Sequence, residues 1–125
     1  MTPKQYNAMP EGDTKLAVRL AITMGWNPSW FWILDNGTFA VAQIVFKNKK
    51  QRWWRSVFNP FTDPSIPYGL IGRGVTGVQK TLYAGYFAWN STETYNDESK
   101  THAIINAFCA ADPLGHWARF MKGGE

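Results

Sequence analysis

Cations and indole rings are interleaved in residues 51–55, Gln-Arg-Trp-Trp-Arg. On an extended strand neighbouring side chains point to opposite faces, so Trp53 and Arg55 would share one face and Arg52 and Trp54 the other. An arginine beside an indole can hold a phosphate through its planar fork while the ring stacks on a base. The same pattern also fits a strand with one Trp in the core and two solvated arginines outside, and both interpretations remain open.

Other candidate ligand-binding residues come later in the chain. Phe87, Trp89 and Asn90 end a predicted strand just before a polar loop. At such a position a sheet commonly offers an aromatic ring that stacks on a ligand and an amide that hydrogen-bonds to the edge of its base. A core aromatic residue followed by a turn asparagine would give the same sequence. Arg73, in a glycine-rich stretch, and Arg119, on the polar side of the last predicted helix, could each hold a phosphate; Arg119 also fits an ordinary surface charge.

Sequence motifs for catalysis and for metal binding are missing. The two histidines, His102 and His116, stand fourteen positions apart with no ligand pattern between them. Cys109 lies in an apolar helical stretch, which indicates a buried structural thiol rather than a nucleophile. The glycines around Arg73 match neither the phosphate-loop nor the dinucleotide pattern. We therefore expect no metal, no cofactor and a protein that binds rather than catalyses, with a hydrolase as the open alternative.

Composition and charge set the broad class. The chain has 125 residues, a formal net charge of +4 and 16% aromatic residues, including seven Trp. A core of this size does not need seven indoles, so we expect some at a binding site or an oligomer interface. The single cysteine fits a reducing compartment, and the polar start and the lack of a long apolar run predict no signal peptide, no membrane span and a cytoplasmic protein.

The elements that must position these residues follow from periodicity and turn chemistry. We expect a helix over 14–24 that is capped by Asp13 and stopped by Gly25, and another that is capped by Asn96 or Ser99 and ended by Pro113. After the first helix the sequence predicts a meander of strands at 30–34, 38–46 and 52–58, with a turn at 35–37. Two further strands are expected at 75–79 and 82–89, followed by a polar loop at 90–98. A short helix is expected at 114–121, after the second long helix.

These elements predict an α+β fold, an antiparallel sheet of about four to five strands flanked by an N-terminal and a C-terminal helix. Residues 1–12 read as a flexible arm, and residues 13–125 as a single sandwich domain. In the connector at 59–74, the side chains of Asn59, Thr62 and Asp63 can bond to nearby backbone and hold a tight turn.

Three segments resemble the phage ABA-sandwich, or NinX-like, family of small phage proteins. The early helix closing on Gly25-Trp26 is similar to that family's opening helix. Residues 58–63, Phe-Asn-Pro-Phe-Thr-Asp, followed by Gly-Leu-Ile at 69–71, resemble its Asn/Asp-Pro…Thr-Asp-Trp segment, although Pro64 stands where the family has Trp. The helix around 103–108 resembles its closing helix, and the family's helix–sheet–helix sandwich matches the fold expected above.

The resemblance implies a phage origin and a role against host defence, in the host cytoplasm. The layout is also similar to phage sponges that sequester cyclic nucleotide or cyclic ADP-ribose immune signals. We therefore expect a homo-oligomer that sequesters a nucleotide-like small molecule, with arginines holding phosphates and Trp53, Phe87 or Trp89 stacking the base. The alternatives are an inhibitor that binds a host defence protein directly and a single-stranded nucleic-acid-binding accessory protein.

Overall fold

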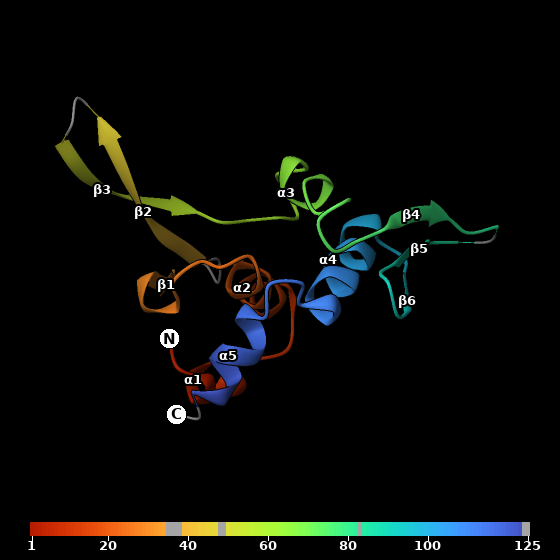
Figure 1. Ribbon diagram of the computed structural model, residues 1–125, viewed down its shortest axis with the longest axis horizontal. Helices are drawn as coiled ribbons and strands as arrows, with labels where there is room; N and C mark the ends of the chain where they lie inside the picture. The colour runs from red at the N-terminus through yellow and green to blue at the C-terminus, as the bar shows by residue number, and fades with distance from the viewer. Residues whose placement is uncertain (35–38, 48–49, 83, 124–125) are drawn as a thin grey trace.

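The computed structural model describes residues 1–125 except 35–38, 48–49, 83 and 124–125, and the backbone alone of residues 42–47 and 50–55. Helices and antiparallel strands are both present, so the predicted α+β class is confirmed (Figure 1). In chain order the elements are α1 (Pro3–Ala8), α2 (Asp13–Thr23), the 3-10 helix η1 (Pro28–Trp30), β1 (Phe31–Ile33), β2 (Phe39–Lys47), β3 (Lys50–Val57), α3 (Ser65–Tyr68), β4 (Gly77–Lys80), β5 (Tyr86–Trp89), β6 (Thr94–Asp97), α4 (Lys100–Ala111) and α5 (His116–Lys122).

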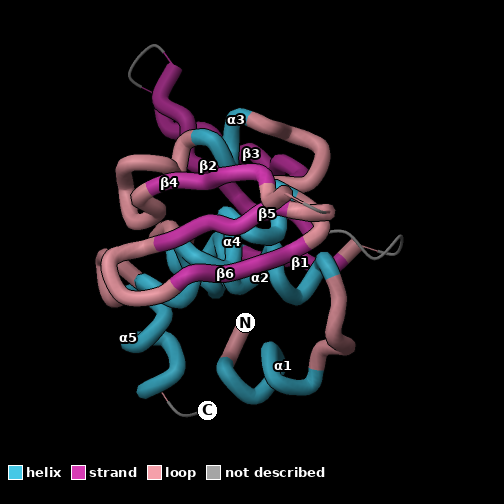
Figure 2. The backbone as a smooth tube through the Cα atoms, turned by 90° about the vertical axis from the view of Figure 1, so that its right-hand side faces the viewer, coloured by secondary structure: helices cyan, strands magenta, loops and turns pink. Residues whose placement is uncertain are grey.

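The strands form two sheets on opposite sides of a pair of helices. Strands β1, β2 and β3 pair antiparallel in that order, and β4, β5 and β6 form a second antiparallel sheet. Helix α4 packs on the second sheet and on α2, and α2 lies between α4 and the first sheet (Figures 1 and 2). The expected single sheet between two helices is therefore wrong: among the described residues six strands form two sheets, and α2 and α4 lie between them.

This difference has a physical reason. Periodicity shows which face of a strand is buried, but it does not show which strand supplies the hydrogen-bond partners. The connector after β3 carries the chain across the helix pair, so β4 begins a new sheet instead of extending the first (Figure 1).

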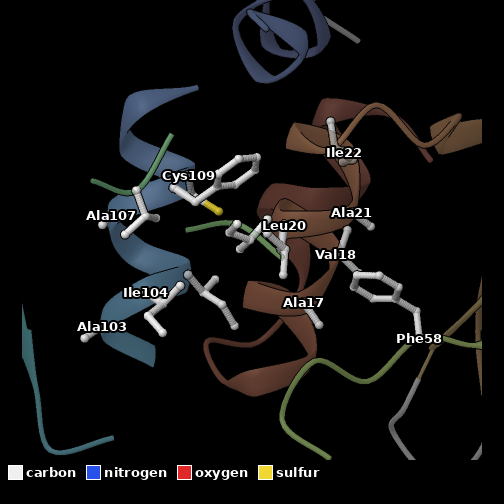
Figure 3. Close-up of a cluster of buried hydrophobic side chains, with 14 of the residues drawn as sticks. Ala17, Val18, Leu20, Ala21, Ile22, Phe58, Ala103, Ile104, Ala107 and Cys109 are labelled. Carbon is white, nitrogen blue, oxygen red and sulfur yellow. The ribbon is translucent and has the colours of Figure 1, made fainter. Parts of the chain in front are cut away.

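The hydrophobic core lies between α2 and α4 (Figure 3). Leu20 of α2 and Ile104 and Ile105 of α4 are at most 1% exposed. Small side chains let α4 approach the second sheet closely: Ala103 and Ala107 lie on the side of α4 that faces this sheet, and other core members occupy the side toward α2. The small and branched apolar residues of α2 and α4 thus form one close-packed layer of helices that lies between the two sheets.

The ends of the two long helices agree with the sequence in part: α4 ends at Ala111, with Asp112 rather than Pro113 at the capping position. Asp13 is the first residue of α2 rather than its predicted cap, no side chain caps this helix, and Gly25 follows it in the left-handed conformation, with φ +100°. Of the two predicted caps for α4, Ser99 is the one used, because its hydroxyl accepts a hydrogen bond from the His102 amide at 3.3 Å. Within the described residues, no helix is long and apolar enough to cross a membrane.

Strand boundaries agree with the sequence best in the first sheet. The meander at 30–34, 38–46 and 52–58 corresponds to β1, β2 and β3, while its predicted turn at 35–37 lies outside the described residues. In the second sheet the prediction was less accurate: β5 covers only the end of the predicted strand at 82–89, and the predicted polar loop contains β6. The β6 sequence Thr-Tyr-Asn-Asp is polar because it is an edge strand with half of its positions exposed.

The N-terminal segment differs from the expected flexible arm. It contains α1, which has a complete capping box: Gln5 donates its backbone N–H to the Thr2 hydroxyl, and the Gln5 side chain accepts from the Thr2 N–H. Tyr6 is only 8% exposed, and its ring lies edge-on against Trp117 of α5 at 4.9 Å between centroids. Prolines and glycine suggest a loop at 1–12, but the buried Tyr6, together with the bond from the Met1 amine to the Pro28 carbonyl at 2.7 Å, docks the segment on the rest of the fold.

The connector contains the side chain to backbone bonds expected of a tight turn. Asn59 Oδ1 accepts from the Phe61 amide at 3.0 Å, and the Thr62 hydroxyl donates to the Asn59 carbonyl at 3.4 Å. Asp63 Oδ1 accepts from both the backbone N–H and the hydroxyl of Ser65, at 3.1 and 2.6 Å, which fixes the start of α3.

Candidate binding site

A pocket of about 580 Å³ opens where the N-terminal segment, the end of α2, η1 and α5 meet. This volume lies within the usual range for small-molecule sites. Helices α1 and α5 lie side by side at this end of the molecule in both backbone views (Figures 1 and 2). The pocket is lined by Met1, Thr2, Pro3, Ile22, Gly25, Trp26, Asn27, Pro28, Ser29, His116, Arg119, Phe120 and Gly123.

The end of α2 builds one wall of the pocket. The left-handed Gly25 turns the chain sharply, and the Trp26 amide bonds back to the Ala21 carbonyl at 3.0 Å. Asn27 then accepts a hydrogen bond from the Ser29 amide at 3.0 Å and starts η1. A Cβ at Gly25 would lie 2.9 Å from His116 Nε2, so only glycine allows the opposite wall to come this close.

Helix α5 builds the opposite wall, and Asp112 sets its position. Asp112 ends α4 in the left-handed conformation with φ +42°, and its carboxylate accepts from the amides of Trp117 and Ala118 at 3.1 and 3.0 Å. The Trp117 ring then packs against Tyr6, and the Arg19 guanidinium lies 4.9 Å from the centre of the same ring. One carboxylate and one indole therefore determine where the pocket-facing side of α5 lies.

Arg119 is oriented by two hydrogen bonds. Its Nη2 donates to the Leu114 carbonyl at 3.1 Å and to His116 Nδ1 at 2.8 Å. Because a guanidinium only donates, His116 Nδ1 must accept, and in the neutral ring Nε2 carries the proton. These bonds use both hydrogens of Nη2, so Nη1 and Nε keep their N–H groups for a ligand. The lining of the pocket therefore includes an exposed guanidinium that is hydrogen-bonded to the neighbouring imidazole.

The pocket combines this cation with aromatic surface and small polar groups. Trp26 and Phe120 are half-buried rings in its lining, and Thr2, Asn27 and Ser29 add polar atoms. Such a lining suits a ligand that carries a flat ring and an acidic group, since the ring packs on aromatic faces and the anion pairs with the guanidinium.

Comparisons with protein-family models, with curated proteins and with solved structures found no match. The resemblance of residues 14–112 to the phage ABA-sandwich family accordingly gains no support from them.

Of the predicted ligand-binding residues whose side chains the structure describes, Arg119 alone lines this pocket. Asn90 is buried: its Nδ2 donates to the Ala107 carbonyl at 2.9 Å, and its Oδ1 accepts from the amides of Thr92 and Glu93 at 2.8 and 2.9 Å. These bonds tie the end of β5 to α4, so the buried amide of Asn90 stabilises the fold.

The other predicted residues lie in separate regions. In β5 the rings of Phe87 and Trp89 pack against each other at 5.6 Å, and a Cβ at Gly77 would lie 2.5 Å from the Trp89 ring, so the indole covers the β4 backbone. Arg73 is exposed in the turn after α3. Strand β3 carries Arg52, Trp53 and Arg55 in the other sheet, where the structure describes their backbone alone.

Sequence reasoning missed most of the pocket because its walls are about ninety positions apart. In the sequence Gly25-Trp26 indicates only a helix end, and His116 is a histidine without a metal-ligand pattern. The signal present in the sequence was the pair His116 and Arg119, which stand three positions apart and therefore share one face of a helix.

Two further titratable groups, His102 and Cys109, lie outside the pocket. His102 Nε2 lies 2.8 Å from Asp13 Oδ1 and its ring stacks on Phe61 at 4.6 Å, which joins the starts of α2 and α4. Cys109 is buried, as predicted, and burial raises the pKa of its thiol to about 11. Among the described residues, no group of three His, Cys, Asp or Glu could hold a metal ion.

Proposed function

We propose that this protein is a non-enzymatic binding protein that holds a small, nucleotide-derived anion in the pocket between α2 and α5. The observation that carries the proposal is Arg119, oriented by two hydrogen bonds in a wall that faces Trp26. An oriented guanidinium binds phosphate with less loss of entropy than a freely rotating lysine, and an indole stacks on any base.

The chemistry of the lining favours binding over catalysis. Among the described residues around the pocket, none carries a carboxylate or a thiol. His116 is held by Arg119 through the nitrogen that a base would use, so its free N–H serves better as a hydrogen-bond donor than as a proton acceptor.

The biological part of the proposal rests on the residue resemblance alone. It is that a phage encodes the protein, that the protein acts in the host cytoplasm, and that it counters host defence by sequestering a nucleotide-derived immune signal, as a homo-oligomer. Native mass spectrometry of protein purified from a host with an active nucleotide-signalling defence tests this part. An oligomer carrying several hundred daltons of releasable ligand supports it, and a ligand-free chain or one bound to a host polypeptide argues for direct inhibition of a defence protein.

A pair of probes tests the pocket itself. Adenosine monophosphate and adenosine differ only in the phosphate, so their affinities for the wild type and for Arg119→Gln isolate the contribution of the guanidinium. Charge-assisted hydrogen bonds contribute about 1.5–3 kcal/mol, so the variant should lose about tenfold or more in affinity for the monophosphate and little for adenosine in isothermal titration.

Lys122→Gln is the matched control, because this exposed cation is on the same helix but does not line the pocket. Its affinity for the monophosphate should stay within about twofold of wild type. Equal losses for both probes in Arg119→Gln, or an equal loss in Lys122→Gln, would contradict the proposed site.

A further inference from the structure

Strands β2 and β3 form a two-stranded ribbon that extends beyond the rest of the first sheet. Strand β1 pairs only with Phe39, Ala40 and Val41 of β2. From Ala42 to Lys47 and from Lys50 to Arg55, the two strands pair with each other alone in the part of the chain that the structure describes. Figure 1 shows this ribbon, at the upper left, projecting away from both helices of the core.

The ribbon carries the whole net charge of the protein. Strands β2 and β3 contain four cations, Lys47, Lys50, Arg52 and Arg55, and no Asp or Glu. The chain has thirteen Lys and Arg and nine Asp and Glu, so removing these four leaves nine cations against nine acids. A net charge of +4 is small when spread over 125 residues, but it is large on one narrow ribbon.

The register concentrates this charge further. At the tip of the ribbon Lys47 pairs directly with Lys50, and like charges opposite each other on neighbouring strands are destabilising. Arg52 follows two positions later, opposite Val45, and Arg55 lies opposite Ala42. Lysines also protect an exposed strand edge from aggregation, but that role does not call for two adjacent tryptophans.

We propose that the β2–β3 ribbon is an arm that binds single-stranded nucleic acid. The four cationic positions supply charge for the phosphate backbone, and Trp53 and Trp54 stand between Arg52 and Arg55 in the sequence, which is the combination that such sites use to stack unpaired bases. A two-stranded ribbon is also narrow enough to enter the major groove of a duplex. The adjacent indoles favour the single strand, because base faces are stacked and covered inside a duplex.

This inference is independent of the pocket, because the ribbon residues lie in β3 and the pocket is built by α2, η1 and α5. The test is fluorescence anisotropy of labelled oligo-dT of about twenty nucleotides with the full chain. Four neutralised phosphates on a single strand predict a log–log salt slope of about −2.8, so the affinity should fall about fiftyfold between about 50 and 200 mM salt.

Arg52→Gln/Arg55→Gln should reduce that slope by about half and weaken binding at low salt by about tenfold or more. Lys4→Gln/Lys80→Gln removes the same charge from exposed positions in α1 and β4 and should leave the affinity within about twofold. Trp53→Leu/Trp54→Leu, which keeps all cations, should also lose about tenfold or more through lost stacking. Thermal unfolding of each variant checks that it is folded.

Three outcomes would overturn the proposal. The first is oligo-dT binding that is absent at low salt or equally weakened in the Lys4/Lys80 control. The second is tighter binding to a duplex of the same length than to the single strand. The third is a wild type that is dimeric and ignores nucleic acid while Arg52→Gln/Arg55→Gln is monomeric, because the ribbon would then be a surface for self-association.

Discussion

The pocket and the ribbon are built in opposite ways. The pocket takes its walls from residues about ninety positions apart, and its cation is held by specific hydrogen bonds to Leu114 and His116. The ribbon takes all of its charge from two consecutive strands, and its register alone places Lys47 opposite Lys50. The pocket therefore depends on the stability of the whole fold, whereas the ribbon depends only on one hairpin.

The largest expected effect comes from Trp117→Ala, which should weaken binding in the pocket and leave binding by the ribbon intact. The Trp117 ring contacts Tyr6, Phe120 and Arg19, so its loss should lower the free energy of unfolding by about 3 kcal/mol and loosen α5. Urea unfolding measures the change in stability. At low denaturant, affinity for adenosine monophosphate should fall while affinity for oligo-dT persists.

Leu114→Ala serves as the control for that experiment, because this side chain is 60% exposed and its removal should cost no more than about 0.5 kcal/mol. A Trp117→Ala protein that keeps its pocket affinity would show that α5 does not need this indole.

A somewhat smaller effect, and one that touches neither region, should come from Asn90→Ala. The variant loses the bonds to the Ala107 carbonyl and to the Thr92 and Glu93 amides, so stability should fall by about 2 kcal/mol. Both ligand affinities should remain unchanged in the folded protein, with the exposed Asn96→Ala as control. Loss of ligand affinity in a folded Asn90→Ala protein would show that Asn90 contributes to ligand binding.

The last effect concerns the shared core, appears only above pH 9, and sets the pH range for the other measurements. Burial raises the pKa of the Cys109 thiol from 9.0 to about 11, so above pH 9 the unfolded chain loses this proton before the folded one. Stability should therefore decline between pH 9 and about 11, and less so in Cys109→Ala. A thiol reagent at pH 8 should react with Cys109 only as fast as the protein unfolds; immediate reaction would contradict the burial.

Local patterns predicted what depends on neighbouring residues. The helix stop at Gly25, the Ser99 cap and the meander of β1, β2 and β3 are encoded in short spacings, and they agree with the structure. The second sheet, the docking of α1 through Tyr6 and the two-walled pocket depend on contacts across the chain, which a single sequence does not display. The ribbon is intermediate: its residues were identified from the sequence, but its isolation from the helices required the topology.

The most direct measurement is a crossed titration of two variants with two probes. Arg119→Gln and Arg52→Gln/Arg55→Gln are each titrated with adenosine monophosphate and with oligo-dT in the same buffer. If the protein has two separate binding surfaces, the first variant loses affinity for the monophosphate alone and the second for oligo-dT alone. If either variant weakens both probes equally while remaining folded, the pocket and the ribbon are not independent sites and the account is wrong.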